Sequence, residues 1–136
     1  MRFVDTNVLL YAISKAPEEE NKARIAGAPL HETELALSSQ VLLEFYVQAT
    51  RPTRAERLTH EQAQGLVESF LRFPVQETTV SLVLASLRSR ARFGLSLWDA
   101  AIVEAARALG CPVVLSEDLQ HDRDYAGVRV LNPFLA

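Results

Sequence analysis

Four acidic residues stand where a globular protein usually has an apolar residue or a helix cap: Asp5, Glu44, Asp99 and Asp118. If the fold brings these carboxylates together, their mutual repulsion is severe unless they share a cation. A site built only from carboxylates favours a hard ion that prefers oxygen ligands, such as Mg²⁺ or Mn²⁺. The residue types therefore point to metal-assisted chemistry on phosphate groups.

Asp5 and Asp118 each follow an apolar run that predicts a buried strand. The structural alternative is an ordinary one, because Asp often caps a helix or begins a turn after a strand. The functional interpretation rests on position, since ligands of open α/β sheets bind at the carboxyl ends of the strands. Asn7, close to Asp5, is placed to orient a water molecule or the Asp5 carboxylate.

Glu44 and Asp99 are expected on helices. Gln40, Glu44 and Gln48 form a polar stripe, which is either a solvent face or a narrow strip on a mostly buried helix. A buried strip of this kind needs a partner. Ser96 and Asp99 have the spacing of a capping box, with Asp in place of the usual Glu or Gln. Capping and metal binding are compatible at this position.

Other polar residues have weaker claims to a functional role. His121 is expected at the surface, with substrate contact as the alternative, and Asp122 and Asp124 are expected either in solvent or as outer carboxylates. Arg88 and Arg92, one helical turn apart, are candidates for holding phosphates. The last turn of a helix also favours arginine through the helix dipole, so both interpretations stay open.

The bulk composition describes one ordinary domain. A chain of 136 residues, taken as a single domain over 1–136, is long enough for a core and too short for two. The formal net charge of -3 gives no electrostatic footprint for nucleic acid. The single cysteine, Cys111, excludes a disulfide framework, and no apolar run reaches the length of a membrane span. We expect a cytoplasmic protein.

The sequence predicts alternating strands and helices. Helices are expected over 6–14, 18–26, 39–50, 59–73, 79–93 and 96–109, and strands over 2–4, 34–37, 75–77, 112–115 and 128–131. Gly27-Ala28-Pro29 is expected to stop the second helix, and Ser39 to cap the third. The helix over 79–93 is predicted from the apolar periodicity of Val80, Val83, Leu84 and Leu87. Apolar strands separated by helices indicate an α/β fold with a parallel sheet covered on both faces.

Taken together, the acidic segments resemble PIN-domain nucleases, and more narrowly the VapC-type toxins of bacterial type II toxin–antitoxin pairs. The segments that carry this resemblance are residues 3–11, 38–45, 95–102 and 115–121. Each segment alone is a weak signal. The four in this order and at these intervals cover essentially the whole chain, and together they are specific.

The resemblance implies a three-layer α/β/α sandwich around a short parallel central sheet, and a homodimer neutralised by a cognate antitoxin. It also implies an Mg²⁺- or Mn²⁺-dependent endoribonuclease that acts on RNA and leaves 5′-phosphate ends. The positions that match the family's acidic quartet are Asp5, Glu44, Asp99 and Asp118. Ser116 matches its Ser or Thr after the last core strand, and Thr6 and Asn7 join Ser116 as substrate-contacting or supporting candidates. The chain has His121 where many members carry a further Asp.

Two other functions compete with this interpretation. One is an inactive PIN scaffold that regulates or binds a partner. Such a scaffold would need no intact acidic quartet, so the four acids argue against it. A HAD-type phosphatase with Asp5 as covalent nucleophile needs a second Asp two residues on and a downstream lysine. The chain has Asn7 at the first position and no lysine after Lys22.

Overall fold

A computed structural model describes residues 1–31 and 34–135, so three residues of the single domain predicted over 1–136 lie outside the described residues. Its strands are β1 (Arg2–Val4), β2 (Leu35–Ser38), β3 (Val75–Gln76), β4 (Val113–Leu115), β5 (Asp124–Tyr125) and β6 (Val128–Leu131). Its helices are α1 (Thr6–Ala12), the 3₁₀ turn η1 (Pro17–Glu19), α2 (Glu20–Leu30), α3 (Ser39–Ala49), α4 (His60–Phe70), α5 (Val80–Phe93) and α6 (Leu97–Ala108).

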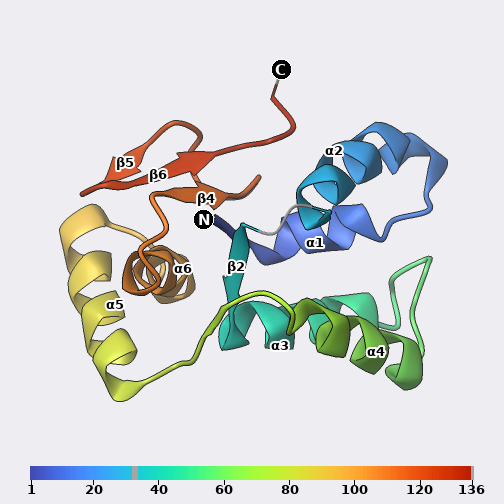
Figure 1. Ribbon diagram of the computed structural model, residues 1–136, viewed down its shortest axis with the longest axis horizontal. Helices are drawn as coiled ribbons and strands as arrows, with labels where there is room; N and C mark the ends of the chain where they lie inside the picture. Colours follow the sequence, from blue (N-terminus) through green and yellow to red (C-terminus); the bar gives the residue numbers. More distant parts are fainter. Residues whose placement is uncertain (32–33, 136) are drawn as a thin grey trace.

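The strands of the described residues form one sheet in the order β3-β2-β1-β4-β6-β5. All neighbouring pairs are parallel except β5 and β6, which form an antiparallel hairpin. Figure 1 shows α5 and α6 on one side of the sheet and α1 to α4 on the other. The predicted α/β sandwich is confirmed, with β5 as an unpredicted antiparallel edge strand.

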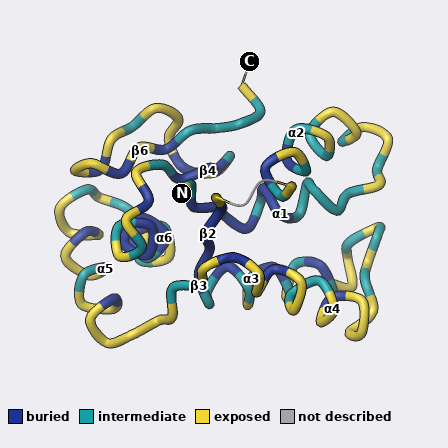
Figure 2. The backbone as a smooth tube through the Cα atoms, in the orientation of Figure 1, coloured by how far each residue is buried: buried dark blue, intermediate teal, exposed yellow. Residues whose placement is uncertain are grey.

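The core lies where the central strands meet α6 (Figure 2). Phe3, Val4 and Val114 have no more than 1% of their surface exposed, because strands covered on both faces present apolar side chains to each layer. On α6, Val103 and Ala106 are fully buried against the sheet. This packing fixes the positions of the strand ends that follow.

The carboxyl ends of β1 and β4 meet at one edge of the sheet. Val4 pairs with Leu115, and the backbone N–H of Asp5 donates to the Leu115 carbonyl at 3.0 Å. The N–H of Ser116 in turn donates to the carbonyl of Leu131 on β6 at 3.1 Å. Asp5 and Ser116 therefore continue the ladder of the sheet, which limits their backbone freedom.

Several predicted element boundaries were wrong, and helix α1 ends at Ala12 rather than at residue 14. Helix α2 begins at Glu20 and continues through Gly27 to Leu30, with Pro29 buried in its last turn. The cap of α3 is Ser38, whose Oγ accepts the N–H of Val41 at 3.3 Å, and not Ser39. Helix α4 ends at Phe70, and the chain turns before Pro74.

Helix α5 was predicted correctly in extent, but its apolar stripe faces outward. Val80 is 77% exposed, and Val83, Leu84 and Leu87 are exposed as well. The buried face of α5 carries Leu82, Ser86 and Ser89. Small side chains on this inner face let α5 lie close to α6, so the periodicity that predicted the helix marks its exposed side.

The structure also tests the expectation about membranes. Over the described ranges, no helix combines the length and the apolar character that crossing a bilayer requires.

Candidate active site

Asp5 caps α1 and is held by groups from two elements. Its Oδ1 accepts the N–H of Thr6 at 2.8 Å. Its Oδ2 accepts the hydroxyl of Ser116 at 2.8 Å and the side-chain amide of Asn7 at 3.4 Å. The cap interpretation is therefore correct, and the same buried carboxylate is also bonded across to the end of β4.

Ser116 fixes the turn that carries Asp118. The side chain of Ser116 is fully buried, and its Oγ accepts the N–H of Asp118 at 3.1 Å and that of Leu119 at 3.2 Å. The same hydroxyl donates to Asp5. Asp118 itself is exposed, so it forms the solvent side of the site.

Glu44 faces α1 and is half-buried. The hydroxyl of Thr6 donates to Oε2 of Glu44 at 3.0 Å, and the amide of Gln40 donates to Oε1 at 3.1 Å. Gln40 also donates to the carbonyl of Trp98 at 3.2 Å, which ties α3 to the start of α6. Gln40 and Glu44 of the polar stripe on α3 therefore have the partners that half-buried polar groups require.

Asp99 lies in the first turn of α6, where Ser96 is the cap and accepts the N–H of Asp99 at 3.1 Å. Burial raises the pKa of Asp99, and its hydrogen bond with Ser96 offsets part of this rise. The charges of Asp118 and Glu44 raise the pKa further. Capping therefore leaves the carboxylate in the field of two other members of the quartet.

Asp5 responds to the same two neighbours. Burial raises its pKa to about 6, and hydrogen bonds from Ser116 and Thr6 act against that rise. The charges of Asp118 and Glu44 raise it again. Because Asp118 and Glu44 act on both Asp5 and Asp99, the four carboxylates form one electrostatic cluster, as their sequence positions suggested.

The residue types of this cluster fit a hard cation. All four side chains are carboxylates, and among the described residues none of them forms an ion pair with Lys or Arg. Their mutual repulsion is therefore uncompensated by protein charge, which a divalent cation would relieve. Within residues 1–31 and 34–135, no three His, Cys, Asp or Glu side chains form a ready-made metal-binding group.

One polar cluster beside the site was not predicted from the sequence. Tyr11 donates to Glu117 at 2.8 Å, Lys22 forms an ion pair with Glu117, and Asn7 accepts the Glu117 N–H at 3.1 Å. The position of Glu117 between Ser116 and Asp118 was a usable signal. The involvement of Lys22, 95 residues away along the chain, has no local sequence signal.

The weaker candidates have partners outside the carboxylate cluster. His121 Nδ1 accepts the backbone N–H of Asn132 at 2.9 Å, and Asp122 pairs with Arg129 at 3.0 Å. Asp124 accepts a backbone N–H within the β5–β6 turn at 2.8 Å. Their contacts in the structure are thus with the backbone and with surface charge.

Comparison with known proteins identifies the family of this chain. The sequence matches the PIN domain family over residues 2–125, and the chain belongs to that family. A search of curated proteins found no match to the sequence.

Solved structures share this fold at low sequence identity. A toxin–antitoxin complex from Klebsiella pneumoniae has a chain 21% identical, with a TM-score of 0.71 and 98% of each chain covered. FitAcB from Neisseria gonorrhoeae is 17% identical with a TM-score of 0.71 over 100% of both chains. VapC20 of Mycobacterium tuberculosis, described as a sarcin–ricin-loop cleaving toxin, is 18% identical with a TM-score of 0.66, covering 87% of this chain and 90% of its own.

Proposed function

We propose that this protein is a metal-dependent endoribonuclease and the toxin of a VapC-type toxin–antitoxin pair, acting in the cytoplasm. The observation that carries the proposal is the electrostatic coupling of four carboxylates at the carboxyl edge of a PIN-type sheet. The similar structures add support, because one of them is described as an RNA-cleaving toxin.

Asp5, Asp99 and Asp118 are the residues we assign to hold Mg²⁺ or Mn²⁺. When bound, such an ion would lower the pKa of a coordinated water and neutralise charge on the phosphate. Asp5 and Asp118 are positioned for this role by Ser116, which bonds to both. Asp99 is positioned by the cap of α6.

Glu44 has a different environment and we assign it a different role. Thr6 and Gln40 each donate to one of its oxygens, so its carboxylate is oriented without being enclosed. A carboxylate held in this way is suited to orient a water molecule or to accept a proton from it. Holding a second ion is the alternative role that we assign to Glu44.

A cognate antitoxin is the proposed protein partner. One similar structure is described as a toxin–antitoxin complex. Two others are VapBC proteins bound to DNA, one from Rickettsia felis with a fragment of its promoter and one from Salmonella typhimurium. We carry over only the class of partner, a protein that binds this chain and suppresses its nuclease activity.

We also propose a homodimer, paired through the outward apolar face of α5. This face, which we call the α5 face, consists of Val80, Val83, Leu84 and Leu87 together with Leu43 of α3 and Trp98 of α6. Leu43, Val83 and Trp98 line one groove of about 680 Å³. An apolar stripe on one helix can pair with its own copy across a two-fold axis, which makes a second copy of the chain the fitting occupant.

The test of the nuclease proposal is a cleavage assay with the purified chain. We would incubate tRNA, rRNA and mRNA with Mg²⁺, Mn²⁺ or EDTA, beside an Asp5→Asn variant. Cleavage that requires the metal and is lost in the variant supports the proposal. A chain that cuts none of the RNAs with either metal, yet still binds an antitoxin, would instead be an inactive PIN scaffold.

A further inference from the structure

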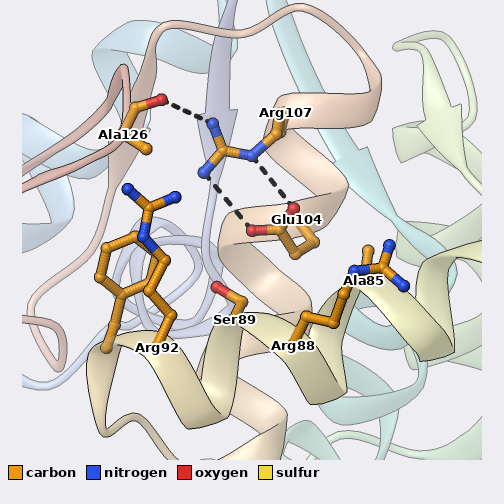
Figure 3. Close-up of a pocket in the computed structure, with 8 residues that line it drawn as sticks. Ala85, Arg88, Ser89, Arg92, Glu104, Arg107 and Ala126 are labelled. Carbon is orange, nitrogen blue, oxygen red and sulfur yellow. Dashed lines mark hydrogen bonds and ion pairs between the residues drawn. The ribbon is translucent and has the colours of Figure 1, made fainter.

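A second pocket, of about 400 Å³, lies between α5, α6 and the β5–β6 turn (Figure 3). We call it the arginine pocket, and its polar lining consists of Arg88, Ser89, Arg92, Glu104 and Arg107. None of the four acidic residues of the candidate active site lines it. Its volume falls within the range of small-ligand sites.

Arg107 is the structural member of this pocket. Its Nε donates to Oε1 of Glu104 at 3.0 Å, and its Nη atoms donate to the carbonyls of Tyr125 and Ala126 at 2.6 and 2.7 Å. The guanidinium is thus committed to holding the β5–β6 turn on α6. It also neutralises the charge of Glu104, which therefore opposes a bound anion only weakly.

Ser89 is the feature of the pocket that the fold does not explain. Its side chain is 5% exposed, and its Oγ has no hydrogen-bond partner in the part of the chain that the structure describes. Figure 3 shows this hydroxyl pointing from α5 into the space below Glu104. A buried hydroxyl without a partner is costly and uncommon, so this hydroxyl is available to donate to a ligand atom.

Arg88 and Arg92 supply positive charge on either side of Ser89. They are one helical turn apart, their side chains are exposed, and neither forms an ion pair with another described residue. The guanidinium of Arg92 lies 4.8 Å from the centre of the Phe93 ring, a contact that orients it. The helix dipole alone favours arginine here, so Ser89 is what distinguishes a binding site from a charged helix end.

We infer that the arginine pocket binds a phosphate group. Figure 3 shows the guanidinium groups of Arg88 and Arg92 extending to opposite sides of Ser89, and a phosphate beside Ser89 has enough oxygens to accept from the hydroxyl and from exposed guanidinium groups that turn toward it. Asp99 and Arg107 are eight residues apart on α6, or about 12 Å along its axis, so the pocket is separate from the acidic cluster. The phosphate comes either from an RNA backbone or from free phosphate or a nucleotide.

The test measures binding without cleavage, so its result is independent of the proposed nuclease activity. Inorganic phosphate is titrated by calorimetry, and a labelled 2′-O-methyl RNA oligonucleotide by fluorescence anisotropy, both in EDTA. Arg88→Gln and Arg92→Gln are each expected to weaken phosphate binding roughly tenfold, the loss of one charge-assisted contact. Ser89→Ala is expected to weaken it about fivefold with no change in net charge.

Controls separate this site from general charge and from misfolding. Arg90→Gln removes an arginine of the same helix whose side chain donates to the Leu95 carbonyl instead, and it should bind phosphate as the wild type does. Ser89→Ala should melt no lower than the wild type, because it removes a buried hydroxyl that has no partner among the described residues.

The same variants identify the source of the phosphate. If Arg88→Gln, Arg92→Gln and Ser89→Ala weaken the binding of the RNA as well, the phosphate is that of RNA. If they weaken the binding of inorganic phosphate alone, the ligand is free phosphate or a nucleotide. Absence of phosphate binding, or equal losses in Arg90→Gln, would overturn the inference.

Discussion

The hydroxyl of Ser116 donates to Oδ2 of Asp5 at 2.8 Å and thereby joins the end of β4 to the end of β1. The same oxygen accepts the N–H of Asp118, so one buried side chain positions two members of the acidic quartet. Ser116 favours the ionised form of Asp5, whereas burial disfavours it. The charge of Asp5 is thus retained near neutral pH through a small number of identifiable contacts.

Replacing Ser116 by Ala tests this link. The variant loses the hydrogen bond that lowers the pKa of Asp5, so that pKa should rise above about 6. The free energy of unfolding at neutral pH should fall by about 2–3 kcal/mol, because a hydrogen bond to a charged group is lost in a buried site. Urea unfolding across a pH series measures both quantities. An unchanged pH dependence would show that Ser116 does not act on Asp5.

The raised pKa of Asp5 also predicts how stability varies with pH. Its ordinary value is 3.8 and its value in the folded protein is about 6, so the folded state binds the proton more tightly than the unfolded state. Stability from this group is therefore fully present below pH 3.8 and is lost as the pH rises through about 6. The full difference corresponds to roughly 3 kcal/mol.

The measurement is the free energy of unfolding in EDTA between pH 4 and 8, with Asp5→Asn as the comparison. The free energy of unfolding should fall more over this interval in the wild type than in the variant. Groups that titrate in both proteins cancel in this difference. Identical curves for the two proteins would mean that Asp5 titrates normally in the fold.

Asp5→Asn should separate stability from activity. The variant removes a buried charge that is repelled by Asp118 and Glu44, while an amide oxygen can still accept the N–H of Thr6. We expect its free energy of unfolding at pH 7.5 to be about 1–2 kcal/mol above that of the wild type, with RNA cleavage lost. Thermal melting and a cleavage assay on one protein batch provide the check. A variant that is both less stable and fully active would contradict this assignment on both counts.

The α5 face predicts the oligomeric state. Leu84→Asp places a charge on the centre of the apolar stripe and should convert a homodimer into a monomer, because an interface core does not accommodate an unpaired charge. Leu71→Asp is the matched control, since Leu71 is 56% exposed and lies outside this face. Sedimentation equilibrium distinguishes the outcomes. A wild type that is monomeric at high concentration would rule out the α5 face as a self-association surface.

Much of the fold was predictable because local patterns and the sheet agree. Continuous apolar runs such as Val113–Leu115 appear where a strand is covered on both faces, and Gly94 ends α5 in the left-handed conformation that glycine adopts most readily. Helix α5 shows where this reasoning fails. Periodicity identifies an apolar face but not what covers it, so it predicted the helix without revealing that Val83 and Leu84 face outward.

The candidate site was predictable to a similar extent. The acids were found from their positions after strands and on helices, because the topology of a parallel sheet brings strand ends together. The contacts that orient them were not predictable, since Thr6 with Glu44 and Ser116 with Asp5 join segments 38 and 111 residues apart. The arginine pocket depends on the Ser89 hydroxyl, which has no hydrogen-bond partner among the described residues, and no sequence pattern signals this.

The central claim is that the acidic quartet cuts RNA with a divalent metal ion. The most direct test is the cleavage rate of one RNA by Asp99→Asn beside Asp122→Asn, each with Mg²⁺ or Mn²⁺ and with EDTA. Both substitutions remove one carboxylate charge. Asp122 is the control because it forms an ion pair with Arg129 at the surface, outside the acidic quartet. Asp99→Asn keeps the backbone N–H that donates to Ser96, so the cap of α6 is retained. We predict that Asp122→Asn cuts at the wild-type rate, that Asp99→Asn loses at least about a hundredfold of the rate, and that EDTA stops cleavage. Cleavage by Asp99→Asn at the wild-type rate, or cleavage that persists in EDTA, would contradict the claim.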